Sequence, residues 1–410
     1  MTKKLFTLCL LFSITNVLYS QKTTPQFRVR TVTAGITLNS LADTTTFNAA
    51  IEFLKKAKQA YIDKGYEVQT VRISTQNLYK YLNQYSYNDA LPFLVSLDKI
   101  AQKNNISLSI GQILQPDKYK AGIGDWAEKL VQITSNISFS LPISSHEMGV
   151  HFNSIKASSE IIVAISKSNG GEACFRFTAS ANCPAGIPFF PAAFHEGINS
   201  FAVGLESANL ITEGFKQNNN PTNARQTLKL LLEKNLMPIQ EIAENISEKL
   251  NWQYGGIDAS PAPGLDASIG QAIETYSKQP FGSSGTLSAC ALITDVLKAL
   301  DIKKCGYSGL MLPIIEDMVL AKRAREKRFT VQELLLFSSV SGTGLDVVPI
   351  PGNTAKQIVE NILTDVAALS LKYTSKALSV RLFLIPGKKA GDIVKFENPH
   401  LTSSVVMKAY

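Results

Sequence analysis

The sequence has only five cysteines among its 410 residues, and no two of them form a C-x-x-C pair. That spacing is typical of structural zinc sites and thioredoxin-like redox motifs, so neither class is supported. Charge clusters are also missing: 41 Lys and Arg stand against 33 Asp and Glu, a surplus of +8. A surplus this small, spread along the chain, argues against nucleic-acid binding and only weakly favours an anionic small ligand.

The overall composition excludes several non-globular classes. With 45% hydrophobic and 18% charged residues, the chain is neither intrinsically disordered nor a collagen or coiled coil. Its length suits two or three domains of about 150 residues, or one large domain. No Ser/Gly/Pro-rich linker divides it, so we predict a single domain over residues 21–410.

Residues 1–20 have the layout of a secretory signal peptide. Lys3 and Lys4 form a basic start, residues 5–12 are mostly apolar, and Ser20 is a small residue before the expected cleavage site. Polar residues interrupt the apolar stretch, which falls short of the ~20 apolar residues of a stable membrane span. We therefore predict a secreted or periplasmic protein, cleaved near Ser20, without a stable span.

Four cysteines remain after cleavage: Cys174, Cys183, Cys290 and Cys305. An oxidising compartment would permit two disulfides among them, in any of three connectivities. Free buried thiols are the alternative, and the sequence leaves both open.

Apolar runs rich in β-branched residues alternate with helical patterns along the chain. Ten runs are predicted as strands: 29–38, 67–74, 106–114, 137–142, 175–181, 200–205, 254–260, 306–312, 345–350 and 379–385. The predicted helices include 46–64, 88–103, 149–166, 223–234, 238–250, 286–300, 331–337 and 355–374. Strands of this kind alternating with helices indicate an α/β fold with a largely buried sheet.

The string HEMGVH resembles the zinc-protease motif, but its histidines are His146 and His151, five residues apart. At about 100° per residue, such side chains point roughly 140° apart on a helix and cannot share one metal. We predict no metal site.

A segment from Cys174 to Gly197 carries three candidate site residues. Arg176 can hold a carboxylate or phosphate through its planar guanidinium. Asn182 follows, and a loop with three prolines then ends at His195, which can transfer a proton near neutral pH. Prolines reduce the entropy that a loop loses on ordering. The structural alternative is a loop in which His195 bonds only to backbone.

Two later strands carry acidic residues. Asp258 and Ser260 lie where an apolar strand ends before prolines, as at the carboxyl edge of an α/β sheet. Asp258 is either a base or acceptor for substrate, or an Asx-turn residue. Asp346 is embedded in an apolar strand and must be paired or hydrogen-bonded if it is buried.

The string FGSSGTLSA precedes an apolar helix, and its Ser284 and Thr286 are further candidates. The helix N-terminus can bind a small anion, although plain capping is the alternative. The string lacks the lysine of a Walker loop and does not fit G-x-G-x-x-G, so nucleotide binding is not predicted. No G-x-S-x-G elbow occurs, which leaves an α/β-hydrolase mechanism without a nucleophile.

Several strings together carry a family resemblance: VRTVTAGITL, YEVQTVRIST, FRFTASANCPAGIPFFPAAFHEG, GGIDASPAP, FGSSGTLSACALITDVLKAL, SGTGLDVVPIPGNT and VRLFLIPGKKAGD. The chain resembles, from Val29 to Asp392, domain of unknown function family 711, also called uncharacterised protein family 210. The resemblance implies a fold like that of pyruvate formate-lyase, a single ten-stranded α/β barrel of two antiparallel five-strand halves surrounded by helices. It implies no established reaction.

Two departures from related patterns limit the chemistry. No R-V-x-G-Y/F glycyl-radical string lies near the carboxyl end, where RLFLIPG stands, so radical chemistry is not expected. Relatives place Cys in the string before GLD where this chain has Ser341, so we do not expect a shared thiol mechanism.

The leading hypothesis is an exported enzyme that acts on a small polar or anionic metabolite inside the barrel; its rival is an exported binding protein without catalysis. The sequence identifies no cofactor and leaves homo-oligomer formation open. Predicted proton-transfer residues are His195, Asp258 and Asp346. Predicted ligand-binding residues are Arg30, Arg72, Arg176, Asn182, Ser260, Ser284 and Thr286.

Overall fold

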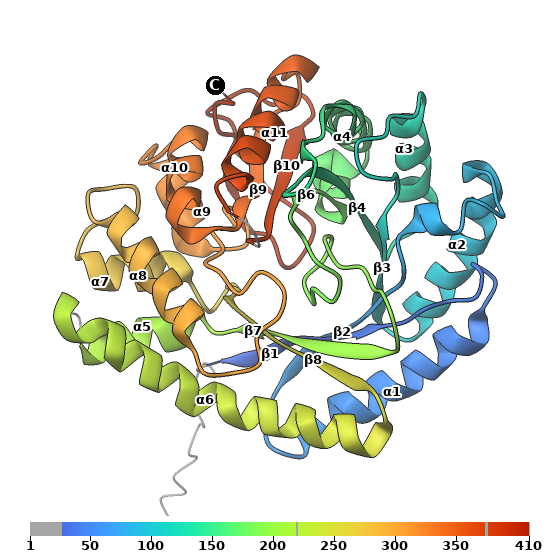
Figure 1. Cartoon of the computed structure of the whole chain (residues 1–410). Helices are drawn as coiled ribbons and strands as arrows, with labels where there is room; N and C mark the ends of the chain where they lie inside the picture. The colour runs from blue at the N-terminus through green and yellow to red at the C-terminus, as the bar shows by residue number, and fades with distance from the viewer. Residues whose placement is uncertain (1–26, 219, 374–375, 410) are drawn as a thin grey trace, which may run out of the picture.

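Helices surround one large curved sheet in the computed structural model, which describes residues 27–218, 220–373 and 376–409 (Figure 1). The predicted leader and cleavage site lie outside these residues. The main strands are β1 (Arg28–Gly35), β2 (Val68–Ser74), β3 (Ile106–Gln112), β4 (Ile137–Ser145), β6 (Phe177–Ala181), β7 (Ser200–Glu206), β8 (Gln253–Pro261), β9 (Gly344–Pro351) and β10 (Leu378–Ile385). Short strands are β5 (Gly149–Val150), which pairs with β4, and β11 (Ile393–Val394) with β12 (Ser404–Val405).

The strand order of the large sheet is β8-β7-β1-β2-β3-β4-β6-β10-β9. The five strands β1, β2, β3, β4 and β6 are parallel to one another. At one side β7 runs antiparallel to β1 and parallel to β8, and at the other β10 runs antiparallel to β6 and parallel to β9. The predicted mixed α/β fold is confirmed, with nine of the ten predicted strands in place.

The exception is the predicted strand at 306–312, which is irregular. Its segment touches both end strands of the sheet: Lys304 forms an isolated parallel bridge with Ile257 of β8, and Pro313 forms one with Asp346 of β9. The backbone therefore runs from one edge strand to the other without forming a continuous ladder. Closure of the sheet into a barrel stays a prediction.

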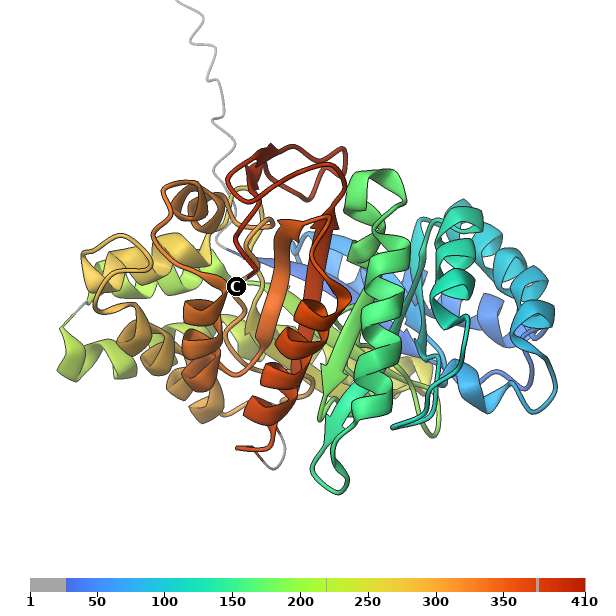
Figure 2. The ribbon, with the colours of Figure 1, turned by 90° about the horizontal axis from the view of Figure 1, so that it is seen from above.

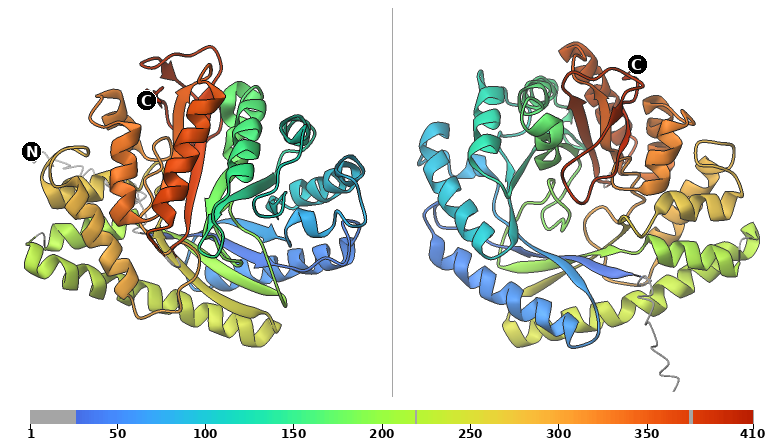
Figure 3. Two further views of the ribbon diagram at one scale, coloured as in Figure 1. Left: turned by 45° about the horizontal axis from the view of Figure 1, so that its top comes forward. Right: turned by 180° about the vertical axis from the view of Figure 1, so that it is seen from behind.

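Most helices lie on the outer face of the sheet, as views from above and from behind show (Figures 2 and 3). They are α1 (Thr44–Ile62), α2 (Tyr87–Lys103), α3 (Ile123–Ile133), α4 (Phe152–Ile165), α5 (Ala208–Gln217), α6 (Pro221–Leu250), α7 (Ile269–Ser277), α8 (Thr286–Ala299), α9 (Met318–Arg325), α10 (Val331–Ser341) and α11 (Lys356–Ser370). No helix of the described residues has both the length and the apolar character needed to span a membrane.

Helix α1 shows how the sequence pattern produces this arrangement. Asp43 caps its start by accepting a hydrogen bond from the backbone N–H of Thr46, and Phe47, Ile51 and Leu54 form a buried face. Apolar side chains three to four residues apart lie on one side of a helix, so this face packs against β1 and β2.

Helix α6 corrects the sequence prediction of two helices that meet near Pro238. It runs unbroken through this proline for 30 residues. A proline inside a helix removes one backbone hydrogen bond. Leu232, Leu236 and Ile239 continue one buried stripe past this point, and burying them offsets that loss.

Residues 182–199, between β6 and β7, fold inward against the sheet (Figure 1). Phe189 packs on Gly204 of β7, where an added Cβ would lie 2.8 Å from the Phe189 ring. Thr33 and Ser109 donate to the carbonyls of Pro188 and Ala193, at 2.8 and 2.6 Å. The proline-rich loop is therefore part of the interior.

The four described cysteines are free thiols, which is one of the two alternatives that the sequence left open. Burial raises the pKa of Cys174, Cys183 and Cys290 to about 12 and that of Cys305 well above its usual value. Thiols with such pKa values remain protonated and unreactive at neutral pH.

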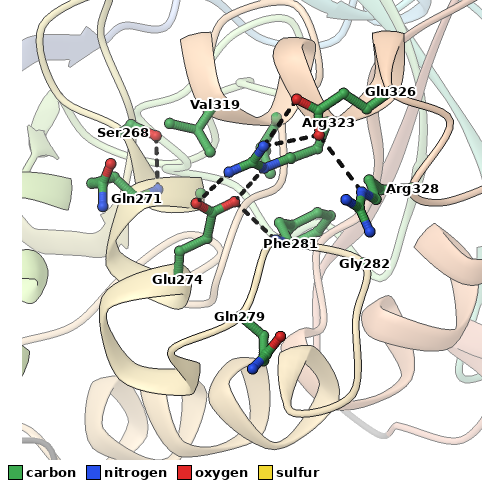
Figure 4. Close-up of polar contacts among 12 residues, drawn as sticks. Ser268, Gln271, Glu274, Gln279, Phe281, Gly282, Val319, Arg323, Glu326 and Arg328 are labelled. Atoms are coloured by element: carbon green, nitrogen blue, oxygen red, sulfur yellow. Dashed lines mark hydrogen bonds and ion pairs between the residues drawn. The ribbon is translucent and has the colours of Figure 1, made fainter.

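A compact ion-pair cluster joins the peripheral helices α7 and α9 (Figure 4). Arg323 donates to both carboxylate oxygens of Glu274, at 2.7 and 2.9 Å, and to both oxygens of Glu326. Asp317 caps α9 and also accepts from the first backbone N–H groups of α7. The guanidinium of Arg323 is thus saturated by its partners.

Candidate functional site

A cavity of about 180 Å³ lies on the inner face of the sheet. Its walls include Phe189, Phe190 and Pro191 of the inward loop. Tyr307 and Met311 of the segment between the edge strands also line it. The charged residues that line it are Arg30, Arg72, Arg176, Glu316, Asp346 and Arg381.

The cavity lies toward the amino-terminal ends of the parallel strands. Ser107 and Ser138 are the second residues of β3 and β4, Asn136 precedes β4, and Arg176 precedes β6. The sequence argument expected a carboxyl edge only for Asp258 and Ser260. The carboxyl edge is the usual ligand site of barrel and open-sheet enzymes, and this cavity lies at the other end of the parallel strands.

Two β-bulges bring charged side chains to the cavity. In β1, Val29 and Thr31 pair with consecutive residues of β7, so Arg30 is the extra residue. In β9, Asp346 and Val347 together stand opposite the single residue Arg381 of β10. Val347 has a φ of +45°, which β-branched residues rarely adopt. Such bulges re-aim side chains and are frequent beside functional sites.

A chain of buried ion pairs crosses one wall of the cavity. Arg30 donates to Glu206 at 3.0 Å and to Glu316 at 3.4 Å. Arg381 donates to the other oxygen of Glu316 at 2.9 Å and to Asp346 Oδ1 at 2.6 Å. Buried charges cost free energy unless they are paired in this way.

Asp346 is the last residue in this series of ion pairs. Its Oδ2 accepts no hydrogen bond from the described residues, whereas Oδ1 is held by Arg381. Burial raises the pKa of Asp346, the nearby Arg381 opposes that rise, and Glu316 adds to it. One carboxylate oxygen therefore remains available to a ligand.

Arg72 of β2 differs from the other arginines. Within the described part of the chain, only its Nε has a hydrogen-bond partner, Thr70 Oγ1 at 3.3 Å. Its guanidinium carbon lies 5.2 Å from the centre of the Phe190 ring. None of the described carboxylates lies within 4.0 Å of it. Burial, together with the positive charges of Arg30 and Arg381, lowers the pKa of Arg72 to about 9. The terminal nitrogens are thus unpaired donors at the cavity.

Arg176 lines the cavity, but its donors are already used. It donates to the carbonyls of Ile137, Val131 and Thr134, at 2.6 to 3.0 Å, and to the Thr134 hydroxyl. Its guanidinium joins α3 to β4, and this structural role leaves little for a ligand.

Asp258 and Ser260 do not line the cavity. Asp258 accepts from the backbone N–H groups of Tyr307 and Ser308, at 2.8 and 2.9 Å, and from Ser260 Oγ. Burial raises the pKa of Asp258, and these hydrogen bonds oppose that rise. Asp258 therefore fixes the backbone of the segment between the edge strands. This role resembles the Asx-turn alternative from the sequence more than that of a base for substrate.

His195 and Asn182 lie at the two ends of the inward loop and outside the cavity lining. The His195 ring packs on Gly35, and its Nε2 lies 3.2 Å from the carbonyl of Gly197. Asn182, with a φ of +52°, donates from its side chain to the carbonyl of Ser370 at 3.1 Å. His195 Nδ1 also lies 3.4 Å from the Ser200 hydroxyl, so its ring contacts a side chain as well as the backbone that the structural alternative expected.

Ser284 and Thr286 lie at the start of α8, also outside the cavity. Thr286 is buried and accepts from the backbone N–H of Gly282 at 3.0 Å, whereas Ser284 is exposed. The N-cap of α8 is Gly285, and neither Ser284 nor Thr286 caps this helix through its side chain.

Arg381 and Glu316 line the cavity but are not among the site residues predicted from the sequence. The available signal was a lone arginine in the apolar run LSVRLFLI, because a charge buried in a strand requires a partner. Among the described residues, no group of three or more His, Cys, Asp or Glu side chains is placed to hold a metal ion.

The fold and site define a class: a mixed α/β protein with a buried, arginine-lined cavity. The model of the family described as "Uncharacterised ACR (DUF711)" matches residues 22–398, and the chain belongs to this family. The family resemblance is thereby confirmed, while the pyruvate formate-lyase-like fold stays a prediction.

Similar proteins are named only as family members. A UPF0210 protein of Pyrobaculum aerophilum is 31% identical over 271 residues, which cover 63% of this chain and 59% of that protein. One from Acetivibrio thermocellus is 25% identical over 93% of this chain and 90% of its own length. One from Pyrobaculum islandicum is 27% identical over 88% of this chain and 83% of its own length.

Proposed function

We propose that the cavity binds a small anionic metabolite through Arg72 and that the protein is an enzyme acting on it. The observation that supports this proposal is the unpaired guanidinium of Arg72, with no described carboxylate within 4.0 Å. A buried charge without a partner is costly, and a bound anion would supply the missing partner. Arginine suits this role because its planar fork matches carboxylate and phosphate groups.

The size of the cavity limits the ligand. A cavity of about 180 Å³ suits a compact carboxylate or inorganic phosphate.

Asp346 is the proposed proton-transfer group. A carboxyl group with a raised pKa and one free oxygen is suited to accept or donate a proton. His195 and Asp258 are not part of this proposal, because neither residue lines the cavity and their polar atoms already bond to other protein groups.

A binding protein without catalysis is the second candidate. Arg381 holds Asp346 through Oδ1 at 2.6 Å, and this contact restrains the carboxylate as a fixed part of a binding wall.

We further propose that residues 21–410 form one domain in which the segment 303–314 completes a barrel. Its bridges to both edge strands support this, because they leave neither edge wholly unpaired. Export after cleavage near Ser20 is also proposed; fractionation of the native host and the N-terminal sequence of the protein would test it.

The main test is calorimetric titration with acetate, glycolate, pyruvate and inorganic phosphate. At least one should bind to the wild type, and Arg72→Met should weaken that binding at least 10-fold. The exposed Arg225→Met is the matched control and should bind normally. Equal binding by Arg72→Met and the wild type would contradict the proposed site.

Catalysis is tested separately by NMR of mixtures of the bound ligand with candidate co-reactants. Asp346→Asn should retain ligand binding and abolish conversion. Binding by the wild type without conversion of any ligand would favour the second candidate.

A further inference from the structure

A second hollow, with a volume of about 640 Å³, shares the residue Tyr307 with the cavity. The side chain of Tyr307 lines the cavity, and the same residue also borders this groove. Four lysines line the groove: Lys298, Lys304, Lys372 and Lys376. No carboxylate of the described residues forms an ion pair with any of the four. We call this surface the lysine groove.

Lys376 occupies a slot built from two glycines. Its side chain passes against Gly309 and Gly342, where an added Cβ would collide with its Nζ and Cε atoms, respectively. Its Nζ then donates to the carbonyls of Tyr307 and Ser308, at 3.2 and 3.5 Å. Gly309 of the string GYSGLM and Gly342 of SGTGLD thus both make room for this lysine.

Lys304 is held in a similar way. Its Nζ donates to the carbonyls of Lys298 and Leu300 at the end of α8, at 2.8 and 2.6 Å. Backbone carbonyls orient both ammonium groups but carry no net charge. Of the described carboxylates, Glu233 acts on Lys304 and Asp258 on Lys376 through their charges, but neither forms an ion pair with these lysines.

Lys298 and Lys372 complete the groove from α8 and from the residues after α11. Both are exposed and neither donates a hydrogen bond within the described residues. Lys372 Nζ lies 5.9 Å from the centre of the Tyr373 ring. These two side chains can move toward a ligand while Lys304 and Lys376 stay in place.

The charges of the lysines act on one another. Burial and the charge of Lys298 lower the pKa of Lys376 to about 8, and only the buried Asp258 opposes this. An anion in the groove would relieve the repulsion and favour the protonated form of Lys376.

We propose that the lysine groove binds the phosphate group of a phosphorylated small molecule, at a site separate from the cavity. Four ammonium groups call for more than one negative charge, and a phosphate monoester carries about −1.5 to −2 at pH 7. Lysine binds phosphate as a point charge. The groove also has the size of sites for small molecules, roughly 300–1,000 Å³.

Calorimetric titration of the full chain with inorganic pyrophosphate at low salt tests the proposal. The wild type should bind, and the double variant Lys298→Met, Lys372→Met should bind at least 10-fold more weakly. A matched double variant, Lys103→Met and Lys129→Met, should bind like the wild type. These two substituted pairs lie near helix ends or on helices, so the folded state should persist, which thermal melting checks.

Arg72→Met separates this site from the cavity and should leave pyrophosphate binding unchanged. The proposal is overturned if the wild type does not bind, if the groove double variant binds equally well, or if Arg72→Met loses as much affinity. Tighter binding to a single-stranded oligonucleotide or to anionic vesicles than to pyrophosphate would also overturn it, because it would assign the lysines to a macromolecular surface. Lys376→Met gives supporting information only where its melting temperature is retained.

Discussion

Two arginine clusters in this molecule solve the problem of a partly buried charge in opposite ways. At the periphery, Arg323 meets Glu274 and Glu326 and every terminal nitrogen has a carboxylate partner (Figure 4). Around the cavity, Arg30 and Arg381 are paired, but Arg72 is not. A saturated cluster joins two helices, whereas an incomplete one leaves donors for a ligand.

Of the substitutions that test this comparison, removal of Glu316 should change the free energy of unfolding most. Glu316→Ala leaves Arg30 and Arg381 short of a shared buried partner, which typically costs about 3–5 kcal/mol in the free energy of unfolding. Urea denaturation measures this loss. Glu274→Ala is the peripheral counterpart and should cost less, because its pair is more exposed; an equal loss would remove the distinction between the clusters.

Gly204→Val tests whether the inward loop forms a packed wall of the cavity. The new Cβ would lie 2.8 Å from the Phe189 ring, and overpacking of this kind costs about 1–3 kcal/mol. Thermal melting should show the loss, and ligand binding in the cavity should also weaken as the loop shifts. Unchanged stability would mean that the loop does not pack as described.

Arg72→Met should leave stability unchanged or raise it by about 1 kcal/mol, since replacing an unpaired buried charge with an apolar side chain removes a cost. Arg323→Met should instead destabilise the protein, because it strands Glu274 and Glu326. Parallel urea curves of the two variants give the comparison. A clear loss of stability in Arg72→Met would indicate a structural partner for this guanidinium.

The pH dependence around His195 should be the smallest effect. Burial lowers the pKa of His195, so below its usual value the unfolded chain binds a proton more readily than the folded one. Stability should therefore fall as the pH decreases from about 6.5 through the lower folded pKa, and His195→Gln should flatten this fall. Part of the slope should remain, because burial also lowers the pKa of His400.

The sequence predicted most strands and helices correctly but was wrong about the strand at 306–312, and the difference has a physical reason. Nine strands and the main helices followed from apolar periodicity, which acts within a few residues. The segment 303–314 was predicted as a strand from the same signal, yet Asp258, about 50 residues earlier, holds it through two backbone N–H groups. Long-range hydrogen bonds of this kind leave no local pattern.

The sequence by itself determined the alternation of strands and helices, the family, and four of the charged residues at the cavity, Arg30, Arg72, Arg176 and Asp346. Only the tertiary structure decided which of them has a partner. Glu316 joins Arg30, 286 residues away, to Arg381, 65 residues away, whereas Arg72 receives no such carboxylate. Whether a buried charge is satisfied depends on groups that folding brings within a few ångströms, and their separation along the chain does not reveal them.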